Sequence, residues 1–158
     1  MLRVDRTDPS KNAVRGFEAF GLLLERDPTL HGRAGLVALL DPSRQEIPEY
    51  AEYRAATERA AEAVNARFGR PGWEPIRVDV RDDFLASVAA YTEYDVLLVN
   101  PVMDGLNLVA KEAPLVGRHG ERRRWLAAIG ASVRAHDLDA WAERELDELE
   151  RRAPAPVA

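Results

Sequence analysis

The stretch 95–112, DVLLVNPVMDGLNLVAKE, holds the residues of this chain that are best suited to bind a ligand. Asp104, Gly105 and Asn107 belong to a short polar turn, and the following segment 108–112 has the composition of a helix start that Asn107 can cap. Free backbone N–H groups and the helix dipole favour an anion at such a helix N-terminus. The stretch therefore predicts a site for an anionic group, such as a diphosphate.

An apolar run, Val96–Val99, precedes this turn and is broken by Asn100-Pro101. A continuous run of aliphatic residues is typical of a strand that is buried on both faces, as in a parallel sheet. A loop between such a strand and the next helix lies at the carboxyl edge of the sheet, where open α/β folds bind ligands. The predicted anion site is therefore expected at that edge.

The rest of the chain alternates between predicted strands and helices. Strands are expected at residues 2–5, 34–40, 76–80 and 96–99, and helices at about 12–26, 48–68, 82–94 and from 108 onward. Either Ser10 or Asn12 can cap the first helix. Regular alternation implies right-handed crossovers and a parallel sheet. We expect an α/β, Rossmann-like, three-layer fold with about four strands in the order 3-2-1-4, followed by extra C-terminal helices.

Composition excludes several other classes of protein. The chain has 158 residues, enough for one ordinary domain, and contains no cysteine, so disulfides and cysteine-based zinc sites are excluded. Its three histidines show no metal-ligand spacing. No apolar run approaches the roughly 20 residues of a membrane span, and a net charge of −5 argues against nucleic acid as the partner. A cytoplasmic location without membrane or nucleic-acid partners is expected.

Four groups of residues resemble the trehalose-phosphate synthase family, in its order and at about its spacing. They are VDRTDPSK at 4–11, DPSR with PEY at 41–50, GWEPI at 72–76 and DGLNLVAKE at 104–112. Validoxylamine phosphate synthase, a close relative, has the same pattern. The resemblance covers about residues 2–116 and resumes near 121–149.

The resemblance implies a GT-B glycosyltransferase of which this chain matches only the C-terminal, donor-binding domain. Most acceptor contacts of the family lie in an N-terminal domain that has no counterpart here. A strand–helix–strand portion that the family has between Val116 and Glu121 is also missing. We therefore expect a shortened donor-binding domain at 1–120, a helical segment at 121–152 and a tail at 153–158.

The resemblance also assigns roles to charged residues. Arg6 and Lys11 match the basic pair that holds the donor diphosphate, whose developing charge needs fixed cations when no metal is present. Asp104 matches the carboxylate that accepts hydrogen bonds from the donor sugar. Arg44 matches an arginine that reaches toward the acceptor phosphate. Without the resemblance, the commoner interpretation of these residues is a solvated loop charge or a turn residue.

Further donor contacts are implied around the turn at 104–112. Gly105 would let the loop backbone approach the ligand, and Glu112 would accept hydrogen bonds from the nucleotide ribose, although a solvated helix glutamate is the alternative. Backbone N–H groups for sugar and phosphate would come from Asn107, Leu108 and Val109. The resemblance implies no metal and no cofactor, with UDP- or GDP-glucose as a substrate.

The implied reaction transfers glucose from a nucleotide sugar to glucose 6-phosphate and yields trehalose 6-phosphate. Because the acceptor domain has no counterpart, we expect the chain alone to be inactive unless a separate polypeptide supplies that half. The alternatives are a non-catalytic module that binds nucleotide sugars or nucleoside diphosphates, and a degenerate fragment. Loss of the neighbouring strand would also leave Val96–Val99 at the sheet edge. That edge is expected to be covered by residues from 121 onward, to pair with another copy, or to weaken the fold.

Overall fold

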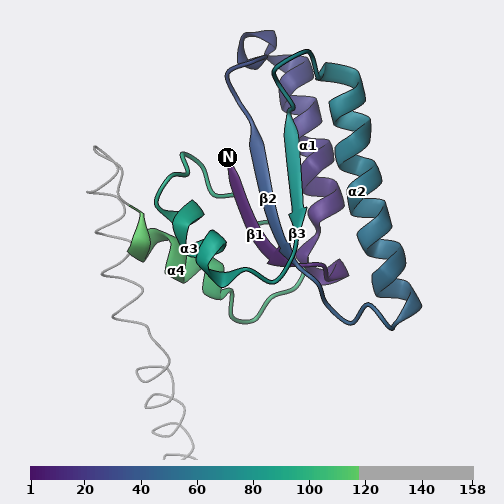
Figure 1. Cartoon of the computed structure of the whole chain (residues 1–158), viewed down its shortest axis with the longest axis vertical. Coiled ribbons are helices and arrows are strands. Elements are labelled where there is room, and N and C mark those ends of the chain that lie inside the picture. The colour runs from purple at the N-terminus through teal and green to yellow at the C-terminus, as the bar shows by residue number, and fades with distance from the viewer. Residues whose placement is uncertain (118–158) are drawn as a thin grey trace, which may run out of the picture. The chain divides into compact units, whose positions relative to one another are not determined.

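The computed structural model describes residues 1–117, and every element named here lies within that range (Figure 1). The strands are β1 (Leu2–Arg6), β2 (Leu36–Asp41) and β3 (Ile76–Val80). The helices are α1 (Ala13–Arg26), α2 (Pro48–Phe68), α3 (Phe84–Tyr91) and α4 (Leu108–Val116). Two short 3-10 turns, η1 (Pro9–Lys11) and η2 (Pro28–Leu30), flank α1.

The three strands form a parallel sheet in the order β1-β2-β3, with β2 in the middle. Leu2 of β1 lies opposite Val37, and Leu36 of β2 lies opposite Ile76. Each connection between the strands carries a helix, as parallel pairing requires. The predicted α/β fold with a parallel sheet is confirmed, and so is the order 3-2-1 of its first three strands.

The fourth predicted strand, Val96–Val99, is reduced to a single parallel bridge between Leu97 and Leu2. Two backbone hydrogen bonds make this bridge, from Leu2 N–H to the Val96 carbonyl and from Leu98 N–H to the Leu2 carbonyl, both 2.8 Å long. The segment lies beside β1, in the fourth position of the predicted order. The ladder does not extend beyond this bridge, and further along the segment the Asn100 carbonyl accepts a hydrogen bond of 3.0 Å from the Asn12 side chain.

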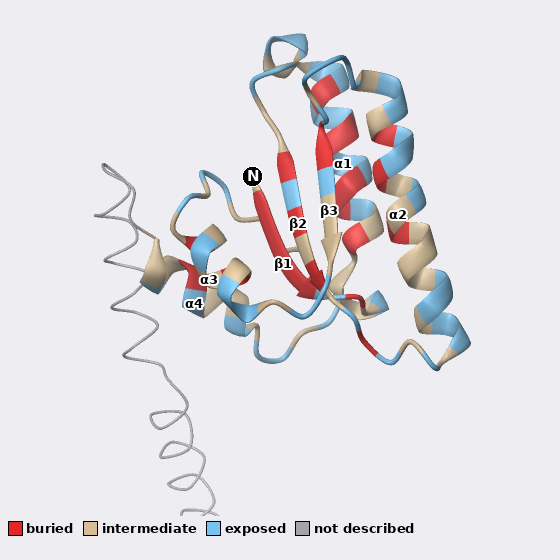
Figure 2. Cartoon of the chain, viewed as in Figure 1, coloured by how far each residue is buried: buried red, intermediate tan, exposed pale blue. Residues whose placement is uncertain are grey.

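Helices cover both faces of the sheet, and Figure 1 shows α1 and α2 on one side with α3 and α4 on the other. The larger core lies between the sheet and α1 and α2. Its buried members are Phe17, Phe20, Leu24, Leu36, Ala38, Leu40, Ala61, Val64 and Ile76. The opposite face has a smaller core of Leu2, Val4, Tyr91 and Ala113. Figure 2 shows this burial concentrated in the strands and along α1.

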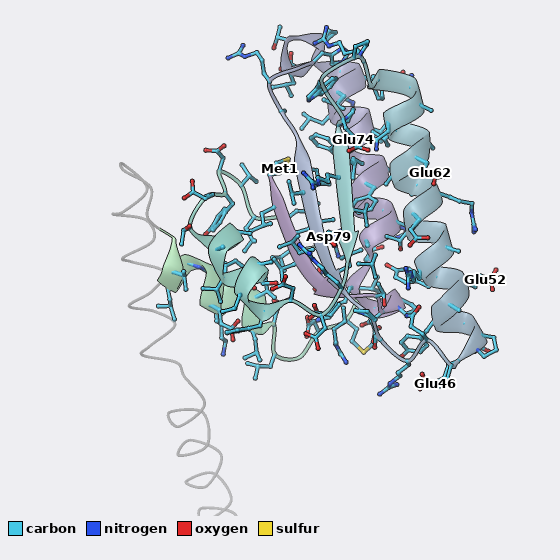
Figure 3. The ribbon with its side chains drawn as sticks, in the orientation of Figure 1. Met1, Glu46, Glu52, Glu62, Glu74 and Asp79 are labelled. Carbon is cyan, nitrogen blue, oxygen red and sulfur yellow. The ribbon has the colours of Figure 1, made fainter. Side chains whose placement is uncertain are left out.

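Helix α2 confirms the predicted range 48–68 and shows why it begins and ends there. Pro48 occupies the first turn, where its missing N–H costs no hydrogen bond. The buried residues Thr57, Ala61 and Val64 follow one face at helical spacing. On the other side, Figure 3 shows Glu52 and Glu62 extending away from the sheet. The long helix therefore packs on the sheet by one narrow stripe.

The start of α1 differs from the predicted cap. Asn12 occupies the position before the helix in a left-handed conformation, with φ of 61°, and its side chain makes no capping hydrogen bond. A side-chain cap is present instead on the preceding turn η1, where the Asp8 carboxylate accepts from the Ser10 backbone N–H at 2.9 Å. The Asn12 amide is thereby available for the loop at Asn100.

Some expectations fall on residues outside the described range. The helical segment 121–152 and the tail 153–158 lie there, so the division of the chain at residue 120 stays a prediction. Cover of the 96–99 segment by residues from 121 onward also stays a prediction, as does its pairing with a second copy. None of the helices between residues 1 and 117 combines the length and hydropathy needed to cross a bilayer.

We predict that Leu24→Ala destabilises the fold by about 2–5 kcal/mol, because it leaves a cavity in the larger core. Leu24 is fully buried, whereas Leu22 on the same helix is 51% exposed. The matched Leu22→Ala variant should change the free energy of unfolding by no more than roughly 0.5 kcal/mol. Urea unfolding of both variants measures the difference, and equal effects would contradict the packing described here.

Candidate functional site

An open pocket of about 330 Å³ lies where β1 and β2 end, next to the start of α4. The loops after these strands meet there because parallel strands all present their carboxyl ends at one edge. Six of the predicted site residues line the pocket, namely Arg6, Lys11, Asp104, Asn107, Leu108 and Val109. Val4, Asp5, Asp41 and Leu106 complete the lining.

The centre of the pocket is an ion pair between Lys11 and Asp104, whose side chains are only 14% and 12% exposed. The Lys11 ammonium lies 2.5 Å from the Asp104 carboxylate. The Asn107 side chain donates to the same carboxylate oxygen at 2.8 Å and accepts from the Ala110 N–H at 2.9 Å. Asn107 is thus confirmed as the cap of α4, and it also fixes the orientation of Asp104.

A second carboxylate, Asp5, lines the pocket beside Lys11. Its Oδ1 atom lies 3.9 Å from the Lys11 ammonium, and its Oδ2 atom lies 2.9 Å from the guanidinium of the fully buried Arg3. Burial raises the pKa of Asp5 to about 6, although Arg3 and Lys11 both act to lower it. Burial likewise lowers the pKa of Arg3, against the attraction of Asp5. The two charges therefore form an ion pair whose desolvation is only partly offset.

Sequence reasoning missed Arg3, Asp5 and Asp41 as parts of the site. Asp41 ends β2, and burial raises its pKa, reinforced by Asp82 and opposed by Arg6. One signal was available for Arg3 and Asp5. They alternate with Leu2 and Val4 in a strand that should be buried on both faces, where charged side chains must be paired.

Thr7 was missed as well, and it ties the loop after β1 to the loop after β2. Its hydroxyl donates to the Asp41 carbonyl at 3.2 Å and accepts from the Ser43 N–H at 3.0 Å and the Gln45 amide at 3.1 Å. Thr7 is 2% exposed. This interaction fixes the spacing between the loop that carries Arg6 and the loop that carries Arg44.

Three of the predicted site residues do not line the pocket. Arg44, with a φ of 45°, donates to the Tyr50 hydroxyl at 3.2 Å and lies 5.6 Å over that ring. Glu112 is exposed on α4. Burial of the Tyr91 phenol raises the pKa of that group, and the nearby Glu112 carboxylate raises it further. Gly105 is also exposed, and a Cβ built on it would meet nothing within 4 Å. Their assigned contacts stay predictions.

The arrangement suits a ligand that carries both anionic oxygens and hydroxyl groups. Arg6 and Lys11 supply positive charge. The Arg6 side chain is 56% exposed, and its guanidinium lies 3.9 Å from the Asp8 carboxylate. Carboxylates of Asp5, Asp41 and Asp104 can accept hydrogen bonds from hydroxyls. Between residues 1 and 117, no three histidine, aspartate or glutamate side chains are grouped as a metal site requires.

Comparison with known sequences gives a consistent result. Residues 1–126 match the sequence model of glycosyltransferase family 20. A glucosylglycerol-phosphate synthase from Pseudomonas anguilliseptica is 38% identical over 108 residues, covering 68% of this chain and 14% of that protein. A trehalose-6-phosphate synthase from Citrobacter koseri is 36% identical over 110 residues, covering 69% of this chain and 23% of the relative.

A trehalose-6-phosphate synthase from Mycolicibacterium gilvum is 32% identical over 201 positions, covering 98% of this chain and 39% of the relative. That alignment is longer than the 158 residues of this chain, so the relative contains residues without a counterpart here. An internally shortened domain is consistent with this difference. The chain spans only 14–39% of the length of these three relatives.

Solved structures resemble the described fold closely. An alpha,alpha-trehalose-phosphate synthase from Burkholderia xenovorans, in complex with glucose-6-phosphate, superposes with a TM-score of 0.72 at 30% identity. An E. coli structure bound with UDP-2-fluoro glucose superposes with a TM-score of 0.71 at 32% identity. Each match covers 74% of this chain and 26% of the solved chain. The resemblance drawn from the sequence motifs is confirmed.

The raised pKa of Asp5 predicts how stability depends on pH. Because the folded pKa of about 6 lies above the unfolded value of 3.8, the folded state binds the extra proton between these values. Stability contributed by this group is therefore lost as pH rises from about 4 to about 6, and amounts to about 2–3 kcal/mol. Wild-type stability should fall over this range by that much more than the stability of Asp5→Asn, measured by urea unfolding. Parallel pH curves for the two proteins would contradict the prediction.

Proposed function

Because the chain belongs to glycosyltransferase family 20, we propose that its pocket binds the donor of a glycosyl transfer, a nucleotide-diphosphate sugar such as UDP- or GDP-glucose. The observation that carries this proposal is the Lys11–Asp104 pair beside Arg6. These residues place two cations that can bind phosphate beside a carboxylate that can bind sugar hydroxyls, all in the lining of one pocket. The E. coli relative bound with UDP-2-fluoro glucose supports it.

In this proposal Arg6 and Lys11 bind the diphosphate and stabilise the charge that develops when the nucleoside diphosphate leaves. When the donor binds, Asp104 would lose its ion pair with Lys11 and accept hydrogen bonds from the sugar instead. The N–H groups of Leu108 and Val109 lie in the first turn of α4, which offers them no intrahelical acceptor. They are therefore placed to bind an anionic or hydroxyl oxygen beside Asp104.

We propose that the full reaction is retaining transfer of glucose to a sugar phosphate, with glucose 6-phosphate as the acceptor and trehalose 6-phosphate as the product. The Burkholderia relative in complex with glucose-6-phosphate supports this acceptor. Arg44 would contact the acceptor phosphate after leaving Tyr50, because it lies on the loop that Thr7 ties to the pocket. A separate polypeptide resembling the N-terminal part of the relatives would supply the remaining acceptor contacts.

A second candidate is a non-catalytic module that binds nucleotide sugars or nucleoside diphosphates. The observation that favours it is that all the residues lining the described pocket lie within residues 1–117. Turnover, in contrast, requires donor and acceptor to be held in register. The two candidates share the same donor site and differ only in whether product forms.

We expect Lys11→Ala to weaken UDP-glucose binding roughly ten- to hundredfold, because a hydrogen bond to a charged group contributes about 1.5–3 kcal/mol. Lys111→Ala removes the same charge from α4, at a position outside the pocket lining, and serves as the matched control. Isothermal titration calorimetry at fixed salt measures both. Equal affinities for the two variants, or no binding by the wild type at millimolar ligand, would reject the proposed donor site.

Incubating the pure chain with labelled UDP-glucose and glucose 6-phosphate separates the two candidate functions. We expect no labelled disaccharide phosphate from the chain alone, even at high protein concentration. Adding the N-terminal part of a trehalose-6-phosphate synthase should restore product if the chain is half of an enzyme. Product from the chain alone would overturn the expected inactivity, and binding without product in either case would favour the module.

A further inference from the structure

We propose that Arg3 is a positioning residue of the donor site: it neutralises Asp5 and anchors the backbone of Lys11, so that the Lys11 ammonium stays available for the ligand. This inference rests on the proposed donor-binding function and goes beyond it. Arg3 does not line the pocket, and its side chain is fully buried in β1 behind Asp5.

The contacts of Arg3 join three parts of the site. Its guanidinium donates to the Lys11 carbonyl and, at 2.5 Å, to the Asn100 side chain, in addition to its ion pair with Asp5. Lys11 precedes α1, and Asn100 belongs to the stretch that leads to Asp104. One buried side chain therefore sets the position of both loops whose charges form the Lys11–Asp104 pair.

The distances show which carboxylate each of the two cations pairs with. Asp5 lies 2.9 Å from Arg3 but 3.9 Å from Lys11, whereas Asp104 lies 2.5 Å from Lys11. Arg3, and not Lys11, is therefore the nearer ion-pair partner of Asp5. If Arg3 were absent, Lys11 would be the nearest cation to two carboxylates, and the group would carry a net negative charge once Asp5 is ionised. Such a group would repel a diphosphate.

The burial of Arg3 is difficult to explain by stability alone. Among the described residues, its Nε atom is the buried side-chain polar atom without a hydrogen-bond partner. Desolvation opposes its charge, and buried ion pairs are often no more stable than apolar residues of similar volume. Gly16 accommodates it, since a Cβ there would lie 2.9 Å from Arg3 Nη1 and 3.2 Å from Asn100 Oδ1. A position that violates a folding rule in this way is typical of a functional site.

The effect on Asp5 can be measured without a ligand. Charged and titratable groups around Asp5 are Arg3 on β1, Lys11 in η1, Asp104 before α4, Tyr91 in α3 and Asp41 at the end of β2. Arg3→Met removes the strongest of the attractive charges. The titration midpoint of the Asp5 carboxyl, followed by carbon NMR, should rise by about 1–3 pH units. An unchanged midpoint would overturn the proposal.

The effect on binding is tested with UDP-glucose, whose two phosphates each keep one negative charge across the pH range 5–9. Affinity of the wild type should fall as pH rises through the Asp5 midpoint, because the ionised carboxylate repels the ligand. In Arg3→Met this fall should move to higher pH, and affinity at pH 5 should be affected least. Arg3→Lys, which keeps the charge, should restore the wild-type midpoint.

Two further variants keep the test decisive. Arg77→Met makes the same change at an exposed position on β3 and should leave both midpoints unchanged. Gly16→Ala retains Arg3 but crowds its guanidinium, and should shift the midpoints in the same direction even if Arg3→Met does not fold. Uniform loss of affinity at every pH, with no shift, would reject the inference while leaving the donor site intact. Absence of UDP-glucose binding by the wild type would instead reject the proposed function.

Discussion

The contact between the Lys11 ammonium and the Asp104 carboxylate joins two loops that lie 93 positions apart in the chain, and the pocket depends on it. It is possible because β1 and the 96–98 segment run parallel, so that the loops following both emerge at the same edge of the sheet. Backbone contacts hold the loops in place, including the 2.8 Å hydrogen bond from the Val102 N–H to the Ser10 carbonyl. The ion pair therefore depends on the topology of the sheet as much as on the two residues.

Opposite charges in this pocket pair with one another. Lys11 is shared between two carboxylates, and Asp104 is also bonded to Asn107. A ligand that offered only negative charge would displace Asp104 from Lys11 and leave a buried carboxylate without its cation, which is costly. A ligand with adjacent phosphate and hydroxyl groups can replace both partners. This pairing of charges supports the proposed preference for sugar nucleotides over simple anions.

Much of this fold could be predicted because its elements have strong local signals. Pro48 and Gly69 bound α2 at the predicted residues, and the alternation in Ile76–Val80 gave β3 correctly. The run Val96–Val99 had an equally strong local signal but pairs with β1 only through the single bridge between Leu97 and Leu2. Thr7 acts through partners more than 30 positions away, and Arg3 contacts the distant Asn100 as well as the nearby Asp5 and Lys11, so spacing along the chain could not reveal how these side chains join the loops. The family resemblance located Lys11 and Asp104, but not the side chains that support them.

The two faces of the sheet are packed unequally, with a large core under α1 and α2 and four buried residues under α3 and α4. Local opening costs least where the fewest apolar contacts must be broken. The wall of the pocket that carries Asp104 and Asn107 belongs to the lightly packed side, and Lys11 belongs to the other. The wall that carries Asp104 and Asn107 should therefore open locally at a lower free energy than the principal core, so its amides should exchange hydrogen faster than those of α1.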